Sequence, residues 1–515
     1  MPASILARVT RPGHILAVFG TFLILTISWA LATPLMGTPD EPSHTTRSAA
    51  VVRGDVVGDY AQDGVFRFPL VQVPDYVERA VELQCYTGNI LQAVDCQGDI
   101  GDDTTLVDSA STAASNNLVY YAIVGLPTLV MKGEAALYGI RIASALVVSM
   151  LLTIMVVALR AQARTVWPVL AAVAATTPSV LLLGGVINPN GVEIAGAGAL
   201  TAVIALILRT SLSARQLWVY ASLAIVSTIL LTSGRTIAVL WVLIIGIVCM
   251  LLVPGARLLE VLKLRQVWFA LGGMLLALVW VVVWMTQLSI RAISPDGAVD
   301  HREPGLLRVV ILMFERTFDS WRDWIGLFGV LELQAPLFVQ FVWGTAIAVT
   351  ILAAIALTHG RLRIAVLVSL AAAVLVPVAV QTALYNEVGM LWQGRYGIPV
   401  YTVLLITCGI ALDSVAKSRL TASQAALVRA GVVVVFVAQL YAFVFVLRRY
   451  VVATSDWISM FIDPLWHPPL TWAGLSVLYF VGCSAALVLI LRWVASHRTV
   501  DVDDRADDEL ALNAR

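Results

Sequence analysis

The chain contains 515 residues, of which 59% are hydrophobic and 13% are charged, and its formal net charge at pH 7 is zero. This composition excludes an ordinary soluble globular protein, whose surface needs about a quarter of charged residues, and the lack of a basic excess argues against a nucleic-acid partner. Apolar runs recur along the chain at about the 20-residue length that a helix needs to cross a bilayer. Because backbone groups in lipid must be paired within the segment, these runs predict an all-α polytopic membrane protein.

The first apolar run, residues 14–36, has features of a secretory signal. It follows Arg8 and Arg11 and contains Ala30-Leu31-Ala32, whose spacing of small residues is typical of a cleavage site. However, the run is longer than a usual signal core, and many apolar runs follow it. We therefore expect an uncleaved transmembrane helix.

A concentrated polar motif follows this run, as Pro39-Asp40-Glu41-Pro42-Ser43-His44. Proline suits the first turn of a helix, and carboxylates are favoured at a helix N-terminus. If a helix begins here, His44 lies one turn beyond the two carboxylates and faces the same side. Asp40, with Glu41 beside it, could then act as a catalytic base that accepts a proton from a hydroxyl. The alternatives are a weak divalent-cation site formed by Asp40, Glu41 and His44, or a motif that only starts the helix.

A long polar loop, residues 37–135, separates the first two predicted spans. Cys85 and Cys96 lie in it, and a disulfide between them is reasonable if the loop is extracytoplasmic. Two unpaired thiols are the alternative. Residues 118–131 are apolar but too short to span, and Pro127 interrupts them, so we expect an interfacial or re-entrant helix there.

The remaining apolar runs complete a predicted bundle of about 12 helices. They cover residues 136–159, 166–186, 192–208, 217–233, 236–253, 267–287, 337–357, 364–384, 398–412, 427–447 and 473–492. The run 217–253 is divided in two because Arg235 would be costly at mid-bilayer. We predict one transmembrane domain over residues 1–492 and a disordered acidic tail over residues 493–515.

Basic residues in short loops set the predicted orientation. They occur in alternate loops, at Arg160, Arg164, Arg209, Arg215, Arg257, Lys263, Arg265, Arg361, Arg363, Lys417, Arg419 and Arg429. The short loop around residues 188–190, on the other side, has none. The pattern predicts a plasma (inner) membrane protein with both termini cytoplasmic and with the loops 37–135 and 288–336 outside.

The second long loop, residues 288–336, contains a periodic apolar pattern. Its members, spaced by three and four residues, are Phe314, Phe318, Trp321, Ile325 and Phe328. We expect an amphipathic helix over residues 314–328 that lies in the headgroup plane. A cap over the bundle with a purely structural role is the alternative.

An arginine motif stands at the external mouth of the tenth predicted span. Arg395 offers a planar fork suited to phosphate oxygens, and Gly394 before it permits close approach of the backbone. Together with Tyr396 at headgroup level, Arg395 could hold the phosphate of a lipid carrier. An arginine that only anchors the helix at the interface is the alternative.

Further polar residues are predicted on the same face. Arg235 lies in the break between the fifth and sixth spans, and Asn188 and Asn190 precede Glu193 at the start of the fourth. Arg235 could be a second phosphate contact with Glu193 as its ion-pair partner, or either could be a simple helix-end charge. The convergence of distant segments on one membrane face favours a functional site.

Together these motifs resemble a known superfamily. The resemblance rests on Asp40-Glu41 after the first span, the long first loop, Tyr120-Tyr121 entering a short helix, Arg141 opening the second span, and Gly394-Arg395-Tyr396 with Pro399. The chain is similar in these features to the GT-C superfamily of integral-membrane glycosyltransferases. More closely, Pro39-Asp40-Glu41-Pro42-x-His44, Asn188-Pro189-Asn190-Gly191-Val192 and Gln393-Gly394-Arg395-Tyr396 resemble an uncharacterised bacterial family of multi-pass membrane proteins grouped with that superfamily.

The resemblance implies a GT-C-like bundle that transfers a sugar from a polyprenyl-phosphate donor, with inversion, to an extracytoplasmic acceptor in the cell envelope, which is a glycan, lipid or protein. It implies Asp40 as the general base with Glu41 beside it. Substrate contacts are expected from His44, Arg235, Arg395, Tyr396, Asn188, Asn190, Tyr121 and Arg141. The lysine often found after the fifth span in this superfamily is Arg235 here. No cofactor is expected beyond a possible divalent cation.

A second class of protein fits the same topology. A transporter or flippase of a lipid-linked envelope component, or a non-catalytic membrane protein, is the alternative. Transporters commonly place essential charges near the bilayer midplane, whereas the candidate charges here are predicted at one face. This placement favours the enzyme.

Overall fold

The computed structural model describes residues 11–60, 69–288 and 305–498. Among these residues, ten helices are long and apolar enough to cross a membrane, and the number rises to twelve if each of two bent helix pairs is one span. The prediction of an all-α bundle of about 12 membrane helices is therefore confirmed.

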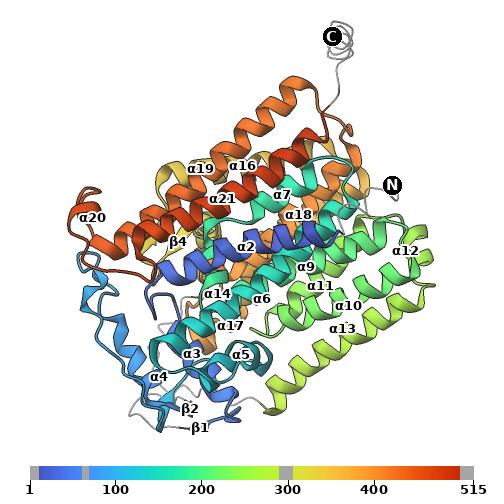
Figure 1. The fold of residues 1–515 in the computed structure, drawn as a ribbon. Coiled ribbons are helices and arrows are strands. Elements are labelled where there is room, and N and C mark those ends of the chain that lie inside the picture. The colour runs from blue at the N-terminus through green and yellow to red at the C-terminus, as the bar shows by residue number, and fades with distance from the viewer. Residues whose placement is uncertain (1–10, 61–68, 289–304, 499–515) are drawn as a thin grey trace, which may run out of the picture.

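The long helices form one bundle (Figure 1). They are α2 (Pro12–Ala32), α6 (Gly133–Gln162), α9 (Pro189–Arg209), α10 (Ala214–Leu231), α13 (Arg265–Val283), α16 (Leu337–Leu357), α17 (Gly360–Val388), α18 (Ile398–Val415), α19 (Ala422–Val452) and α21 (Thr471–Ala495). The bent pairs are α7 (Trp167–Ala175) with α8 (Pro178–Gly185), and α11 (Ala238–Leu251) with α12 (Gly255–Val261), which turn by 62° and 115°. Proline stands at or just before the start of the second helix of each pair, where its missing N–H interrupts the helical hydrogen bonds.

Shorter elements connect the spans. The helices are α3 (Glu41–Val51), α4 (Asp75–Arg79), α5 (Leu118–Val124), α14 (Leu306–Asp319), α15 (Trp321–Gly326) and α20 (Ser459–Ile462). Short 3₁₀ helices cover Ala80–Gln84, Val94–Cys96, Leu126–Leu129 and Gly394–Gly397, and a turn of π-helix covers Trp284–Leu288. The strands are β1 (Asp59–Tyr60), β2 (Pro69–Pro74), β3 (Leu106–Ala110), β4 (Leu327–Phe328) and β5 (Leu333–Gln334). Strands β1, β2 and β3 form an antiparallel sheet in that order, and β4 pairs with β5.

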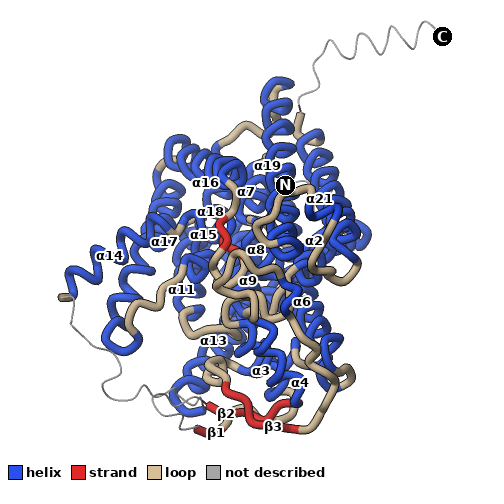
Figure 2. The backbone as a smooth tube through the Cα atoms, turned by 90° about the vertical axis from the view of Figure 1, so that its left-hand side faces the viewer, coloured by secondary structure: helices blue, strands red, loops and turns tan. Residues whose placement is uncertain are grey.

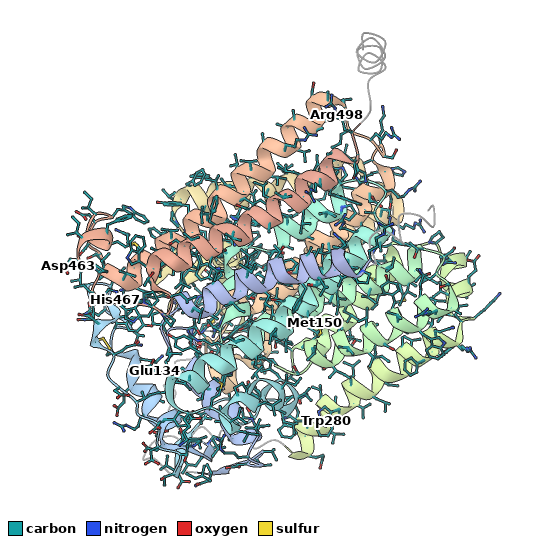
Figure 3. All side chains as sticks on the ribbon, viewed as in Figure 1. Glu134, Met150, Trp280, Asp463, His467 and Arg498 are labelled. Carbon is teal, nitrogen blue, oxygen red and sulfur yellow. A yellow bond between two sulfur atoms is a disulfide. The ribbon has the colours of Figure 1, made fainter. Side chains whose placement is uncertain are left out.

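The sheet gathers with α3 and α4 at one end of the bundle, which we call the loop end (Figure 2). Glu134, at the start of α6, and Arg498, after α21, lie at opposite ends of the molecule (Figure 3). Helix α2 begins and α21 finishes at the end away from the sheet (Figure 1). Both ends of the described bundle therefore emerge on the side opposite to the loop end.

Helices α9 and α18 form the centre of the bundle. Almost all of their apolar surface is buried, whereas α13, α16 and α21 are mostly exposed, as expected for helices that face lipid. Small residues allow close packing around α9: a Cβ added at Gly198 would lie 2.5 Å from the sulfur of Met155 in α6. Such small-residue contacts are a usual way to pack membrane helices, because lipid gives no hydrophobic drive between them.

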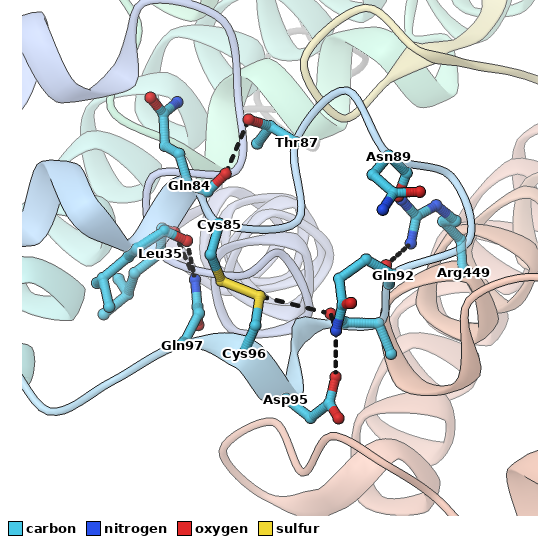
Figure 4. Close-up of a disulfide and its surroundings, with 12 residues drawn as sticks. Leu35, Gln84, Cys85, Thr87, Asn89, Gln92, Asp95, Cys96, Gln97 and Arg449 are labelled. Carbon is cyan, nitrogen blue, oxygen red and sulfur yellow. Dashed lines mark hydrogen bonds between the residues drawn. A yellow bond between two sulfur atoms is a disulfide. The ribbon is translucent and has the colours of Figure 1, made fainter.

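A disulfide joins Cys85 and Cys96 at the loop end, with 6.1 Å between the Cα atoms (Figure 4). The segment between the two cysteines is tied to the bundle, because Arg449 of α19 donates to the backbone oxygens of Gln92 and Asn89 at 2.8 and 3.1 Å. The disulfide thus closes the loop, and Arg449 attaches the loop to α19.

Two predicted interfacial helices differ from expectation. The segment 118–131 is a short helix, α5, followed by a single turn, and Gly125 separates the two. The predicted amphipathic helix 314–328 is wrong as a single element. Helix α14 ends at Asp319, and α15 follows from Trp321 and leads into β4. Phe318 is exposed whereas Phe328 is fully buried, so the periodic residues do not share one face.

Candidate active site

The Pro39–His44 motif starts helix α3, as its proline predicts. Asp40 is the residue just before the first turn, and its backbone oxygen accepts from the N–H of His44 at 3.0 Å. Asp40 adopts a left-handed conformation with φ of 63°, which is uncommon outside glycine although aspartate adopts it more readily than most residues. This conformation turns Asp40 and Glu41 in different directions, so that the two neighbours have different partners.

Asp40 forms an ion pair with Arg395. Its Oδ2 lies 2.5 Å from Nη2 of Arg395, and the Arg395 side chain is 5% exposed while that of Asp40 is 46% exposed. Arg395 comes from the turn Gly394–Gly397 before α18, some 355 residues along the chain. The structure therefore brings the first loop and the tenth predicted span to one place.

Arg235 lies beside this pair. It is in the break between α10 and α11, and its Nη2 donates to Oδ1 of Asn190 at 2.9 Å. Its guanidinium carbon stands 4.0 Å from the ring centre of Tyr396, and that of Arg395 stands 5.2 Å from the same ring. Two cations thus stack on one phenol ring.

Arg235 forms no ion pair within 4 Å with any residue that the structure describes. The expected ion pair between the Arg235 and Glu193 side chains is therefore wrong, although the Arg235 backbone N–H is hydrogen-bonded to the Glu193 carboxylate. Glu193 is buried, and one of its oxygens accepts from the Asn190 amide at 3.4 Å while Oε1 has no side-chain partner. Asn188 connects the Pro39–His44 motif to α9. Its side-chain amide donates to the Pro39 carbonyl at 3.0 Å, and its side-chain oxygen accepts from the backbone N–H of Asn190 and so caps α9.

His44 is buried against Tyr121. Its Nδ1 lies 2.9 Å from the Tyr121 hydroxyl, which also accepts from the amide of Asn116 at 2.9 Å. The hydroxyl oxygen can accept a second hydrogen bond or donate its own proton, so the direction of its bond with Nδ1 depends on the imidazole tautomer. Burial lowers the pKa of His44 to about 3, with Arg235 and Arg395 adding to the effect against the attraction of Asp40. His44 is therefore neutral at physiological pH, and its Nε2 has no partner.

The electrostatics of Asp40 are set by its cationic neighbours. Burial alone would raise the pKa of the Asp40 carboxyl, but Arg395, through charge and hydrogen bonding, and Arg235 lower it below its ordinary value. Neutral His44 adds no charge of its own. Asp40 is therefore ionised, and its basicity is reduced as long as the ion pair with Arg395 is intact.

Glu41 and Arg141 form a second, fully buried ion pair with both side chains 0% exposed. All five N–H donors of Arg141 are used, on both oxygens of Glu41 and on the backbone oxygens of Ala30, Thr33 and Pro34. The arginine thus joins the end of α2 to the start of α3. This arrangement favours a positioning role for both residues over the catalytic role expected for Glu41 and the substrate contact expected for Arg141.

The proposed divalent-cation set does not fit this geometry. Glu41 is bound by Arg141 and by the hydroxyl of Thr38 at 3.0 Å, and Asp40 is bound by Arg395. Within the described part of the chain, no three side chains of His, Cys, Asp or Glu type converge as a metal site would require.

Asp323 of α15 packs against Gly394, the residue before Arg395, and was not among the predicted site residues. A Cβ added at Gly394 would lie 2.5 Å from the Cβ of Asp323, so only glycine fits between the two segments. The Gly394 N–H contributes a hydrogen bond to the Asp323 carboxylate, although burial, the largest influence, raises the pKa of that group. Gly394 was the only available signal in the sequence, and we interpreted it as room for the backbone to approach a ligand rather than a neighbouring loop.

The fold and the site define a polytopic helical membrane protein with a cationic polar site at the loop end. The chain matches the family described as "Predicted membrane protein (DUF2142)" over residues 23–406 and belongs to that family. The matched range contains every residue of the site described above. No curated protein matches the chain.

Among solved structures, the chain is similar to the crystal structure of ArnT from Cupriavidus metallidurans in the apo state. The two are 14% identical with a TM-score of 0.42, and the match covers 92% of this chain and 76% of that chain. A likeness of this strength carries no conclusion about activity.

Proposed function

We propose that this protein is a membrane glycosyltransferase that moves a sugar from a polyprenyl-phosphate donor to a hydroxyl of an extracytoplasmic cell-envelope acceptor. The observation that carries the proposal is the meeting of Asp40, Arg395 and Arg235 at the loop end. One carboxylate and two arginines are what a transfer from a phosphate leaving group needs. The motif resemblance to the GT-C superfamily supports the same reaction class.

In the proposed reaction Asp40 accepts the proton of the acceptor hydroxyl. The hydroxyl oxygen bonds to the anomeric carbon of the sugar as the bond from that carbon to the phosphate oxygen breaks. The electron pair of the broken bond stays on the polyprenyl phosphate, whose charge becomes more negative. Arg395 and Arg235 stabilise this charge, and attack from the face opposite to the phosphate gives inversion.

The residues around the three charges supply orientation. Tyr396 holds the two guanidinium groups by stacking, and Asn190 fixes Arg235. His44, neutral and with Nε2 unpaired, is placed to hydrogen-bond a sugar or acceptor hydroxyl. Tyr121 holds the His44 ring in place through its hydroxyl rather than contacting the substrate itself.

The distribution of charge disfavours the transporter alternative. In the described spans, each charged residue lies within about two turns of a helix end. A transport site for ions would place such groups near the midplane. The buried pair Arg209–Asp413 lies at the ends of α9 and α18, where it joins helix ends in the same way.

The test is to incubate purified protein with candidate polyprenyl-phosphate sugars and acceptors, and to measure released polyprenyl phosphate. Asp40→Asn should abolish release while leaving the protein folded in the membrane. Arg395→Ala should weaken use of the donor. Full transfer by the Asp40→Asn variant would exclude Asp40 as the base, and no release from any donor with the wild-type protein would count against the reaction class.

A further inference from the structure

Arg395 has more hydrogen-bonding capacity than the protein uses. An arginine side chain has five N–H donors. Arg395 makes one short bond to Asp40, contacts of 3.3 Å to the Pro39 carbonyl and 3.4 Å to the Tyr396 hydroxyl, and none through Nε. The side chain is nevertheless deeply buried, since only 5% of it is exposed. Buried donors without acceptors are costly, so this guanidinium keeps donor capacity that the oxygens of a ligand could use.

Arg141 provides a comparison within the same molecule. It is more deeply buried than Arg395, and it pairs with the neighbour of Asp40, yet all five of its donors have acceptors. The fold at the loop end is therefore able to satisfy a buried arginine completely. Nε is also without a partner in the buried Arg47 and Arg449, so an unpaired Nε does not by itself mark a site. Arg395 differs from Arg449 in the accessibility of its carboxylate partner, since Asp40 is 46% exposed and Glu332 is 15% exposed.

The surroundings of Arg395 indicate the charge of the missing acceptor. The Arg235 guanidinium stacks on the same ring as Arg395, that of Tyr396, and has no ion pair within 4 Å among the residues described, although the Arg235 backbone N–H is hydrogen-bonded to the buried Glu193 carboxylate. Of these two guanidinium groups, only that of Arg395 is in an ion pair. A phosphate offers several oxygens and binds arginine through two parallel bonds, so it can use both the unpaired donors of Arg395 and the charge of Arg235.

The Asp40 carboxylate is placed so that a ligand can displace it from Arg395. Its side chain is 46% exposed, and the ion pair holds it through Oδ2. Its backbone is in the left-handed region with φ of 63°. The Asp40 carboxylate therefore takes up a donor of Arg395, while its own side chain stays accessible and its backbone stays in the left-handed region.

We propose that Asp40 stands in for the phosphate of a polyprenyl-linked substrate: the phosphate displaces the carboxylate from Arg395, and the freed carboxylate then serves the acceptor hydroxyl. The ligand class is a phosphate mono- or diester on a polyprenyl chain. The inference rests on the proposed function for this ligand, although the exchange itself needs no transfer reaction. It gives the site an order, in which the lipid phosphate binds before the base acts.

The exchange explains how a carboxylate paired with arginine becomes a base. When phosphate neutralises Arg395, the main influence that lowers the pKa of Asp40 is removed, and the nearby phosphate charge raises that pKa further. A site without its donor thus contains no active base. This order protects against proton transfer in the absence of the sugar, because Asp40 is occupied until the phosphate arrives.

The experiment measures binding of decaprenyl phosphate to the purified full-length protein in nanodiscs. Asp40→Asn removes the competing carboxylate and should bind decaprenyl phosphate about tenfold more tightly than wild type. Glu82→Gln removes an exposed carboxylate of the same loop and should leave the affinity unchanged. Arg395→Ala should lose binding.

A second variant guards against a folding effect of the asparagine substitution. Asp40→Gly also removes the carboxylate, and glycine accepts the left-handed backbone of this position. Both variants should bind more tightly, with an unfolding midpoint at or above that of wild type for the glycine variant. Unchanged or weaker binding in a folded Asp40→Gly protein would overturn the exchange, because Asp40 would then hold Arg395 ready for the phosphate.

Inorganic phosphate distinguishes the two sources of the anion. A preference for decaprenyl phosphate supports a lipid-linked ligand, and equal affinity for inorganic phosphate overturns it. The result of this binding experiment can be told apart from the result of the transfer assay that tests the proposed function. Tighter binding by both variants without sugar transfer from any donor refutes the transferase alone, whereas transfer by wild type without tighter binding refutes the exchange alone.

Discussion

Glu41→Gln separates a structural from a catalytic role for the second carboxylate of the motif. Glu41 accepts from Arg141 at 2.7 and 2.8 Å, and both side chains are 0% exposed. A hydrogen bond to a charged group contributes about 1.5–3 kcal/mol, and breaking one partner of a buried pair costs about 3–5 kcal/mol because the other charge remains buried. Glutamine retains one acceptor oxygen, so we expect the free energy of unfolding to fall by about 3 kcal/mol, the lower end of that range.

The assay is a denaturant titration of the purified protein in detergent, with the transfer assay run on the same samples. Glu82→Gln, at an exposed site of the same loop, should change the unfolding free energy by less than about 0.5 kcal/mol. Arg141→Met should be destabilised in the same way, and the double variant should cost much less than the sum of the two, because both remove one interaction. A Glu41→Gln protein as stable as wild type but without activity would refute the reasoning and return Glu41 to the catalytic site.

Three further predictions follow from other parts of the loop end. Gly394→Ala would bring a Cβ to 2.5 Å from the Cβ of Asp323, so transfer and phosphate binding should be lost while the unfolding midpoint measured by light scattering stays within a few degrees of wild type. Replacing Cys85 and Cys96 by serine should lower stability by about 2–3 kcal/mol, and reductant should lower the wild type to the same value but leave the variant unchanged. For His44 the folded pKa of about 3 lies below the ordinary value of 6.5, so the unfolded chain binds the proton first and stability should fall as pH decreases from about 6.5 towards 3. His44→Gln should reduce that slope in unfolding measurements across this window, and an unchanged slope would show that other groups cause it.

The membrane bundle could be predicted because a long apolar run has few structural outcomes in lipid. The alternation of spans also decided which loops share a face, and this placed Asp40, Arg235 and Arg395 together without any knowledge of their contacts. The start of α3 followed from one proline and its neighbouring carboxylates. These features depend on local chemistry and on the number of times the chain crosses the membrane.

The division of roles between Asp40 and Glu41 could not be predicted. It depends on the left-handed backbone at Asp40, which turns adjacent carboxylates towards different arginines. The saturation of Arg141 depends equally on where the last carbonyls of α2 point, which no spacing in the sequence records. The break after Asp319 was missed for a related reason, because apolar periodicity continues across it while the backbone does not.

The aromatic ring of Tyr396 holds the guanidinium groups of Arg235 and Arg395 beside it, at 4.0 and 5.2 Å from the ring centre. Like charges repel, and without the ring the two arginine side chains would be free to spread apart along the surface. The ring therefore acts as a shared rigid support for both cations. The positions that the two guanidinium groups offer to an anion depend on this support, so a smaller side chain at this position would change which headgroups fit and not merely how tightly they are held.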